Sequence, residues 1–148
     1  MADTSNTGAN QYWLIKFAPF RTKWVEIVRR GIFTLRGVRS REARQNLAKM
    51  RRLDQVLFYH SQQELAVVGL MEVTREAYSD PTSADSFWLT CDFRPLRTFE
   101  EPVHLQTIKS VPELASVPLI RRPRLAVMPL TETEFHTILA LAEGRSEA

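Results

Sequence analysis

A histidine and a serine stand next to each other at His60-Ser61, where the strand-forming run VLFY leads into a polar segment. Such a pair could do hydrolytic chemistry if the imidazole took the proton of the serine hydroxyl. Adjacent residues of a strand point to opposite faces of the sheet, however, and no Gly-x-Ser-x-Gly turn surrounds Ser61. The pattern therefore favours a binding or structural role for both residues.

The sequence contains no other signature of catalysis or of a cofactor. His60, His104 and His136 show neither H-x-x-x-H nor H-E-x-x-H spacing, and there is no Walker lysine and no G-x-G-x-x-G loop. Cys91 is the single cysteine, which excludes an intrachain disulfide and a zinc site built from several thiolates. We expect no enzyme activity, no metal and no cofactor.

Positive charge is concentrated in one segment. Nine arginine and lysine residues lie between Arg29 and Arg52, with Glu42 as the single acid among them, although the whole chain carries a net charge of only +3. Such asymmetry indicates an anionic partner, most often a nucleic acid. The alternative is a solvated helix face that happens to be rich in arginine.

The composition is that of a soluble globular protein with one domain, since 44% of the 148 residues are hydrophobic and 25% are charged. No apolar run approaches the ~20 residues of a membrane span. The polar start MADTSNTGAN has no signal-peptide pattern. We expect a flexible leader at 1–11, a domain at 12–144, a short tail at 145–148, and a cytoplasmic location without membrane contact.

The elements that must position these residues alternate between strands and helices. Residues 12–17 form a strand, a helix capped by Thr22 buries Trp24, Ile27 and Val28 before Gly31 ends it, and Ser40 caps a helix over 41–50. A hairpin then joins strands 56–60 and 65–75. We further expect a loop at 79–86, a strand at 87–93, a helical turn before Pro112, a strand ended by Pro129, and a last helix with a Thr131/Glu134 capping box. This order predicts an α+β domain with a small curved sheet or barrel surrounded by short helices.

Several blocks of the sequence together resemble the EVE domain, a family of the PUA-like superfamily related to the YTH readers of methylated adenine. The blocks are YWLIKFAP, RGVRSREARQNL, VLFYHS, VVGLMEVTREAYSDPT, PVHLQTIK and LIRRPRLAVMPLT, and they extend over almost the whole chain. The resemblance implies a pocket that accepts a modified base, for instance a methylated one, flipped out of DNA or RNA. It implies no covalent chemistry.

The resemblance also suggests which residues meet the nucleic acid. A flipped base is recognised by stacking and by hydrogen bonds to its edge, while basic residues beside the pocket hold phosphates. The basic residues expected to contact the backbone are Arg36, Arg39, Arg41 and Arg44. The residues expected at the ligand site are Trp13, Lys16, Phe17, Leu35, Ser40, Tyr59, His60, Ser61, Tyr78, Asp80, Arg124 and Ala126.

Departures from the family pattern fall on these expected site positions. Phe17-Ala18 stands where Ser-Glu is usual, Leu35 where tryptophan is usual, Ser40 replaces asparagine and Ala126 replaces serine. The usual Tyr-Pro-Asp-Pro is here YSDP. We expect an altered, less polar pocket in which Phe17, Phe33 or Trp24 could replace the missing wall. Two alternatives stay open, namely an RNA- or tRNA-associated module and a protein-interaction scaffold with a degenerate pocket.

Overall fold

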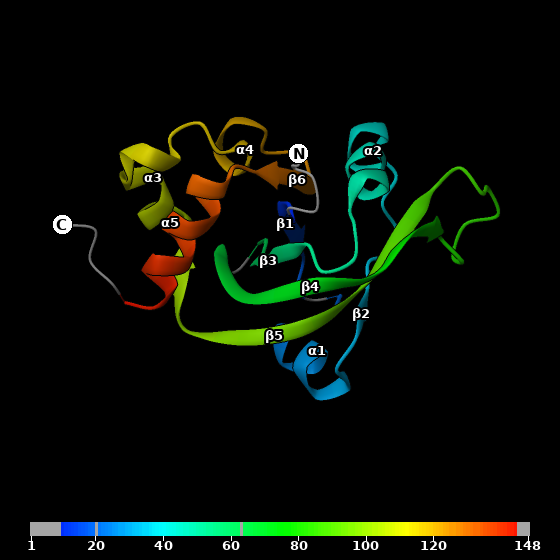
Figure 1. The fold of residues 1–148 in the computed structure, drawn as a ribbon, viewed down its shortest axis with the longest axis horizontal. Coiled ribbons are helices and arrows are strands. Elements are labelled where there is room, and N and C mark those ends of the chain that lie inside the picture. Colours follow the sequence, from blue (N-terminus) through cyan, green and yellow to red (C-terminus); the bar gives the residue numbers. More distant parts are fainter. Residues whose placement is uncertain (1–9, 20, 63, 145–148) are drawn as a thin grey trace.

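The computed structural model describes residues 10–19, 21–62 and 64–144. Residues 1–9 of the expected leader and the expected tail at 145–148 lie outside the described residues. Six strands form one mixed sheet in the order β2-β5-β4-β3-β1-β6, with helices around it (Figure 1). The strands are β1 (Tyr12–Phe17), β2 (Phe33–Thr34), β3 (Gln55–His60), β4 (Ala66–Ser79), β5 (Leu89–His104) and β6 (Val127–Leu130). The helices are α1 (Trp24–Arg30), α2 (Arg41–Lys49), α3 (Leu105–Ser110), α4 (Pro118–Arg121) and α5 (Glu132–Ala142), with a 3-10 turn at Pro112–Leu114.

The centre of the sheet is buried on both faces. β1 runs parallel to β3, and the remaining strand pairs of the described chain are antiparallel. Consecutive residues of β1, Trp13, Leu14 and Ile15, are almost completely buried, so helices or other strands must cover both sides. The α+β prediction is confirmed, and the sheet is open rather than closed into a barrel because β2 and β6 form two edges.

The strands β4 and β5 are longer than the sequence pattern predicts. They form a hairpin that projects from the body of the molecule beside α2 (Figure 1). The expected end of β5 at Phe93 is wrong, since the charged segment RPLRTFEEPVH continues the strand to His104. β2 pairs with β5 only at Asp92 and Phe93. At Pro95, β5 therefore has one neighbouring strand, β4, and the missing N–H of proline is tolerated there. The same reasoning applies to Pro129, which lies inside the edge strand β6 instead of ending it.

The helix ends follow the sequence signals with one exception. Ser40 caps α2 by accepting from the Ala43 N–H, and the capping box at the start of α5 is present. For α1, Lys23 rather than Thr22 occupies the N-cap and supplies no side-chain cap. Val28 is 45% exposed instead of buried, because only the side of α1 that carries Trp24 and Ile27 faces the sheet.

Candidate nucleic-acid interface

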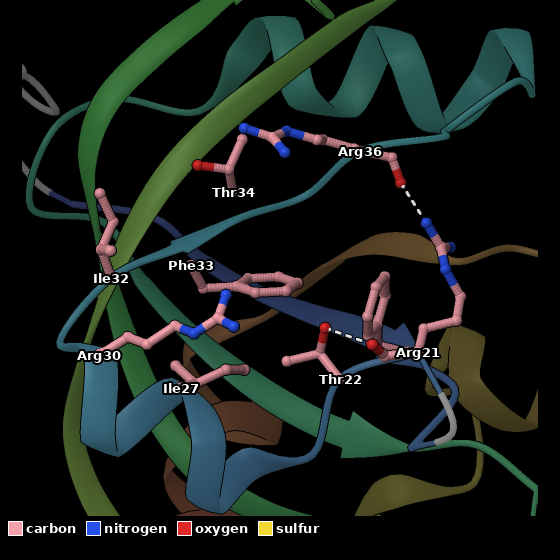
Figure 2. A pocket seen from close by; sticks show the side chains of 9 residues that line it. Arg21, Thr22, Ile27, Arg30, Ile32, Phe33, Thr34 and Arg36 are labelled. Atoms are coloured by element: carbon pink, nitrogen blue, oxygen red, sulfur yellow. Dashed lines mark hydrogen bonds between the residues drawn. The ribbon is translucent and has the colours of Figure 1, made fainter. Parts of the chain in front are cut away.

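A pocket of about 300 Å³ opens where the end of β1, the helix α1 and the short strand β2 meet (Figure 2). Arginines, threonines and aromatic rings surround it, and no acidic side chain lines it among the described residues. Its volume is at the lower end of those of small-molecule sites. We call it the arginine pocket, and its lining residues are Phe17, Arg21, Thr22, Ile27, Arg30, Ile32, Phe33, Thr34 and Arg36.

Arg21 connects two walls of the arginine pocket. Its guanidinium lies over the Phe17 ring, 4.4 Å from the centroid, and its Nη2 donates to the Arg36 carbonyl at 2.8 Å (Figure 2). A Cβ on residue 37 would lie 3.1 Å from this Nη2, and the backbone of Gly37 has φ +89°. Glycine is therefore needed at this position for both space and conformation.

Two aromatic rings and two further arginines complete the arginine pocket. Phe17 and Phe33 pack edge to face with their centroids 5.1 Å apart. In Figure 2 the Arg30 guanidinium points into the pocket beneath the Phe33 ring, and the Arg36 side chain extends along the opposite wall near Thr34. The pocket thus offers cationic planar groups, hydroxyls and apolar ring surface together, which is the chemistry that binds a nucleobase.

The loop that carries Arg36 is fixed to the β4–β5 hairpin by Asp80. The carboxylate is fully buried and accepts from the Gly37 N–H at 2.9 Å, the Arg39 guanidinium at 3.0 Å and both the N–H and hydroxyl of Thr82. Burial by itself would raise the pKa of Asp80, but these hydrogen bonds outweigh burial and hold it well below its usual value. Asp80 therefore lies behind the loop as its anchor.

Arginines of α2 and of the preceding loop pack against aromatic rings of the hairpin. Arg41 and Arg44 lie 5.3 Å and 4.1 Å from the centroid of Phe87, and the Arg44 Nε donates to the Phe87 carbonyl at 2.6 Å. Arg39 lies 5.8 Å from the centroid of Trp88. These contacts hold three cations beside the hairpin, an arrangement suited to phosphate groups.

A second, shallower pocket of about 360 Å³ contains two of the residues expected at the ligand site, Ser40 and Arg124. Arg122 pairs with Glu42 through both guanidinium Nη atoms. The ammonium of Lys16 donates to the carbonyl of Pro123 at 2.5 Å, and burial lowers the pKa of this lysine. Lys16 thus binds the backbone of Pro123, which lines this pocket.

Several residues that the sequence places at the ligand site lie in the core or bind neighbouring side chains. Trp13, Leu35 and Tyr59 are at most 3% exposed, and burial raises the pKa of the Tyr59 hydroxyl. The Trp13 indole N–H donates to Asp54 at 3.0 Å. Further along the chain, the Tyr78 hydroxyl donates to Asp92 at 2.5 Å, and the half-buried Ala126 accepts the Lys16 N–H through its carbonyl at 2.8 Å. The structure brings Phe17 and Arg36 to the arginine pocket, and Ser40 and Arg124 to the second pocket.

His60 and Ser61 do not form a nucleophile–base pair in the structure. The His60 Nδ1 lies 3.0 Å from the Glu64 carboxylate, and its Nε2 accepts the Trp24 N–H at 3.3 Å, which fixes the proton on Nδ1. The Ser61 N–H donates to the carbonyl of Phe17 at 3.0 Å. His60 therefore supplies the acceptor that α1 lacks at its N-cap, and it helps to position the helix that forms one wall of the arginine pocket.

Sequence reasoning did not assign six residues of the arginine pocket to the site. They come from the loop before α1, from α1 itself and from the segment that leads into and includes β2. The first and last of these are too short or irregular to show a hydrophobic periodicity. One signal was available, because Gly31 ends α1 and the alternation that follows turns Phe33 inward and its neighbours outward. The missed residues are Arg21, Thr22, Ile27, Arg30, Ile32 and Thr34.

Neither a metal cluster nor a membrane-spanning helix occurs in the part of the chain that the structure describes. Within residues 10–19, 21–62 and 64–144, no group of three histidine, cysteine or acidic side chains could hold a metal ion. Over the same ranges, no helix has the length and apolar character needed to cross a bilayer.

The fold is an α+β domain of the PUA-like class with a basic, ring-lined pocket. The EVE domain model matches residues 11–141, and the chain belongs to this family. Mouse thymocyte nuclear protein 1 is 33% identical over 72% of this chain and 58% of its own length, so the chain spans less than two thirds of that relative.

Solved structures agree with the family assignment. A protein from Agrobacterium tumefaciens is 33% identical and superposes with a TM-score of 0.88, covering 93% of this chain and 96% of the other. Human THYN1, solved in complex with DNA containing 5-methylcytosine, is 25% identical with a TM-score of 0.77, covering 90% of this chain and 98% of the other.

Proposed function

We propose that this chain is a reader of modified DNA, which binds a modified base flipped into the arginine pocket and performs no chemistry on it. The observation that carries the proposal is the human THYN1 structure, a relative with the same fold that was solved with DNA containing 5-methylcytosine. The arginine pocket supports it, because its residues supply what a flipped base requires: surfaces to stack on and hydrogen-bonding groups at the base edge.

The contacts suggest a role for each group. The Arg21 guanidinium, which lies over Phe17, presents a planar surface for the base. The hydroxyls of Thr22 and Thr34 already donate to the Arg21 carbonyl and to Asp92, so they can accept hydrogen bonds from donors at the base edge. Arg39, Arg41 and Arg44 lie on α2 and the loop before it, against rings of the hairpin, where they would hold the flanking phosphates. His60 and Ser61 contribute to positioning and not to reaction.

The proposal includes looser selection than in relatives that have a tryptophan at position 35. Leu35 is buried beneath the loop and its side chain does not line the arginine pocket, so it offers no stacking surface. The stacking surface that remains, the rings of Phe17 and Phe33, is apolar, and an apolar wall discriminates only about 10–200-fold for each methylene-sized difference. We therefore propose that the pocket accepts several modified bases; RNA as a further ligand and a cytoplasmic location remain predictions from the sequence.

A binding titration tests the function. Fluorescence anisotropy would compare duplexes that are identical except for one central cytosine, which is unmodified or 5-methylated, and the methylated duplex should bind more tightly. Arg36→Gln should weaken this preference, whereas Arg52→Gln removes an exposed charge of the same basic segment outside the pocket and should leave it intact. Equal affinity of the wild-type protein for modified and unmodified duplexes would contradict the proposal.

A further inference from the structure

A branched apolar side chain is exposed at the rim of the arginine pocket. Ile32 is 50% exposed although it lies between the helix-ending Gly31 and the buried Phe33. In Figure 2 it lies at the edge of the pocket, on the side opposite Arg21. The next residue, Phe33, points into the core, and successive side chains of an extended chain alternate in direction. The Ile32 side chain therefore faces outward.

The backbone around Ile32 is fixed on both sides. The Gly31 N–H donates to the Ile27 carbonyl at 2.8 Å in a left-handed C-cap with φ +77°. Phe33 is 5% exposed and pairs with Phe93 across β2 and β5. A β-branched side chain has few rotamers, so Ile32 keeps a defined direction at the rim.

The surroundings of Ile32 are cationic. Arg30 and Arg36 line the same pocket, and Glu26, the acid of α1, is engaged by Arg29 and lies 3.5 Å from the Arg30 Nε. Duplex DNA has apolar stacked bases between two negatively charged backbones. An apolar side chain flanked by guanidinium groups complements such a surface better than it complements an apolar protein surface.

We infer that Ile32 is a wedge, which enters the base stack of duplex DNA at the position left by the base bound in the arginine pocket. The inference rests on the proposed function and adds the element that stabilises the opened duplex. Flipping a base costs its stacking and pairing energy and leaves a gap. Apolar side chains inserted between base steps compensate such unstacking in other DNA-binding proteins, and Ile32 is the exposed apolar residue among those that line this pocket.

The test compares duplex and single-stranded DNA, because a single strand has no stack to fill. For a duplex with one 5-methylcytosine, Ile32→Ala should weaken binding on the order of tenfold, because less apolar surface is buried. The affinity of the Ile32→Ala variant for the methylated single strand should stay unchanged. Val28→Ala is the matched control, since Val28 is 45% exposed on the preceding turn but does not line the pocket, and it should change neither affinity. Ile32→Leu should retain most of the duplex affinity.

Other outcomes would overturn the inference. Equal weakening of duplex and single strand would show that Ile32 contacts the base itself, and unchanged duplex binding would show that it has no role. A change in the oligomeric state with Ile32→Ala, measured by sedimentation, would assign the side chain to a protein contact. If the wild-type protein does not prefer methylated DNA in either form, the reader function fails first and the wedge with it, whereas failure of the wedge alone leaves that preference intact.

Discussion

At the scale of single residues, polar groups that look reactive in the sequence serve as structural connectors. His60 joins Glu64 to the start of α1, and Asp80 joins the loop before α2 to the hairpin. Both side chains are buried, and a buried polar group is costly unless hydrogen bonds satisfy it. Their contribution to the proposed binding is therefore indirect, through the position of the pocket walls.

Gly69 should tolerate no side chain. A Cβ there would lie 2.2 Å from the Trp24 ring, which packs on the backbone of β4 and donates from its indole N–H to Thr98. Gly69→Ala should lower the free energy of unfolding by about 1–3 kcal/mol because the ring must shift. Gly31→Ala is the contrast: it meets open space but has φ +77°, and should cost about 1 kcal/mol through backbone strain alone. Urea denaturation measures both, and equal stability of Gly69→Ala and wild type would refute the packing.

Asp80 should make the protein sensitive to acid. Its pKa is lower in the folded than in the unfolded state, so its stabilisation is complete above the unfolded value of about 3.9 and is lost as the pH falls below it. Asp80→Asn should be less stable than wild type at neutral pH by about 1–3 kcal/mol, because donors to the carboxylate lose their partner. Urea unfolding as a function of pH measures this difference, which should shrink in acid; a constant difference would argue against the lowered pKa.

At the scale of elements, the short helix α1 depends on the sheet for its position. It has seven residues and no side-chain cap of its own, so it would not be stable in isolation. The Trp24 ring on Gly69 and the His60 imidazole at the first turn hold it against β3 and β4. Since α1 carries Ile27 and Arg30, the shape of the arginine pocket depends on these two contacts.

His60→Ala should therefore affect stability and binding together. It leaves the buried Trp24 N–H without an acceptor and should cost about 1–3 kcal/mol. Affinity for methylated DNA should fall as well, because α1 becomes less well positioned. Ser61→Ala is the control, since the Ser61 contact to Phe17 is made by the backbone and should persist. Thermal unfolding and anisotropy titration would measure the two effects. Full binding affinity of the His60→Ala variant would show that binding does not depend on the position of α1.

At the scale of the whole molecule, the basic segment is divided between two places. Arg30 and Arg36 line the arginine pocket, whereas Arg41 and Arg44 lie against the β4–β5 hairpin. The loop between them is fixed by Asp80, so both groups of cations keep one relative position. In the proposed function, DNA contacts the pocket with a base and the hairpin side with its phosphates.

The hairpin arginines should determine the salt dependence of binding. Replacing Arg41 and Arg44 by Gln should weaken all duplexes alike and reduce the log–log salt slope by about 0.9 for each phosphate that the variant no longer neutralises. The preference for the methylated base should stay the same. Arg51→Gln together with Arg52→Gln removes the same charge from the same segment, away from Phe87, and should leave the slope unchanged. An unchanged slope in the Arg41/Arg44 variant would show that this face does not bind DNA.

Most elements of the fold could be predicted from the sequence, because their signals are local. Ser40 and the Thr131/Glu134 pair mark helix starts by their spacing, Gly31 marks a helix end, and the apolar runs of β1 and β3 mark buried strands. The family could be identified in the same way, since its motifs are contiguous blocks. The charge of the basic segment favoured an anionic partner, but charge alone left a solvated, arginine-rich helix face equally open.

The composition of the pocket was decided only by the tertiary structure. Arg21 meets Arg36 across 15 positions of the chain, and Trp24 meets His60 across 36, and no local pattern encodes such distances. Burial also depends on the partner elements. Trp13 and Tyr59 face the core because helices and strands cover both sides of the central sheet, whereas Ile32, in the turn between α1 and β2, stays exposed because no other part of the described chain packs over it. Local sequence determines which elements form, whereas long-range packing determines which side chains remain available for binding.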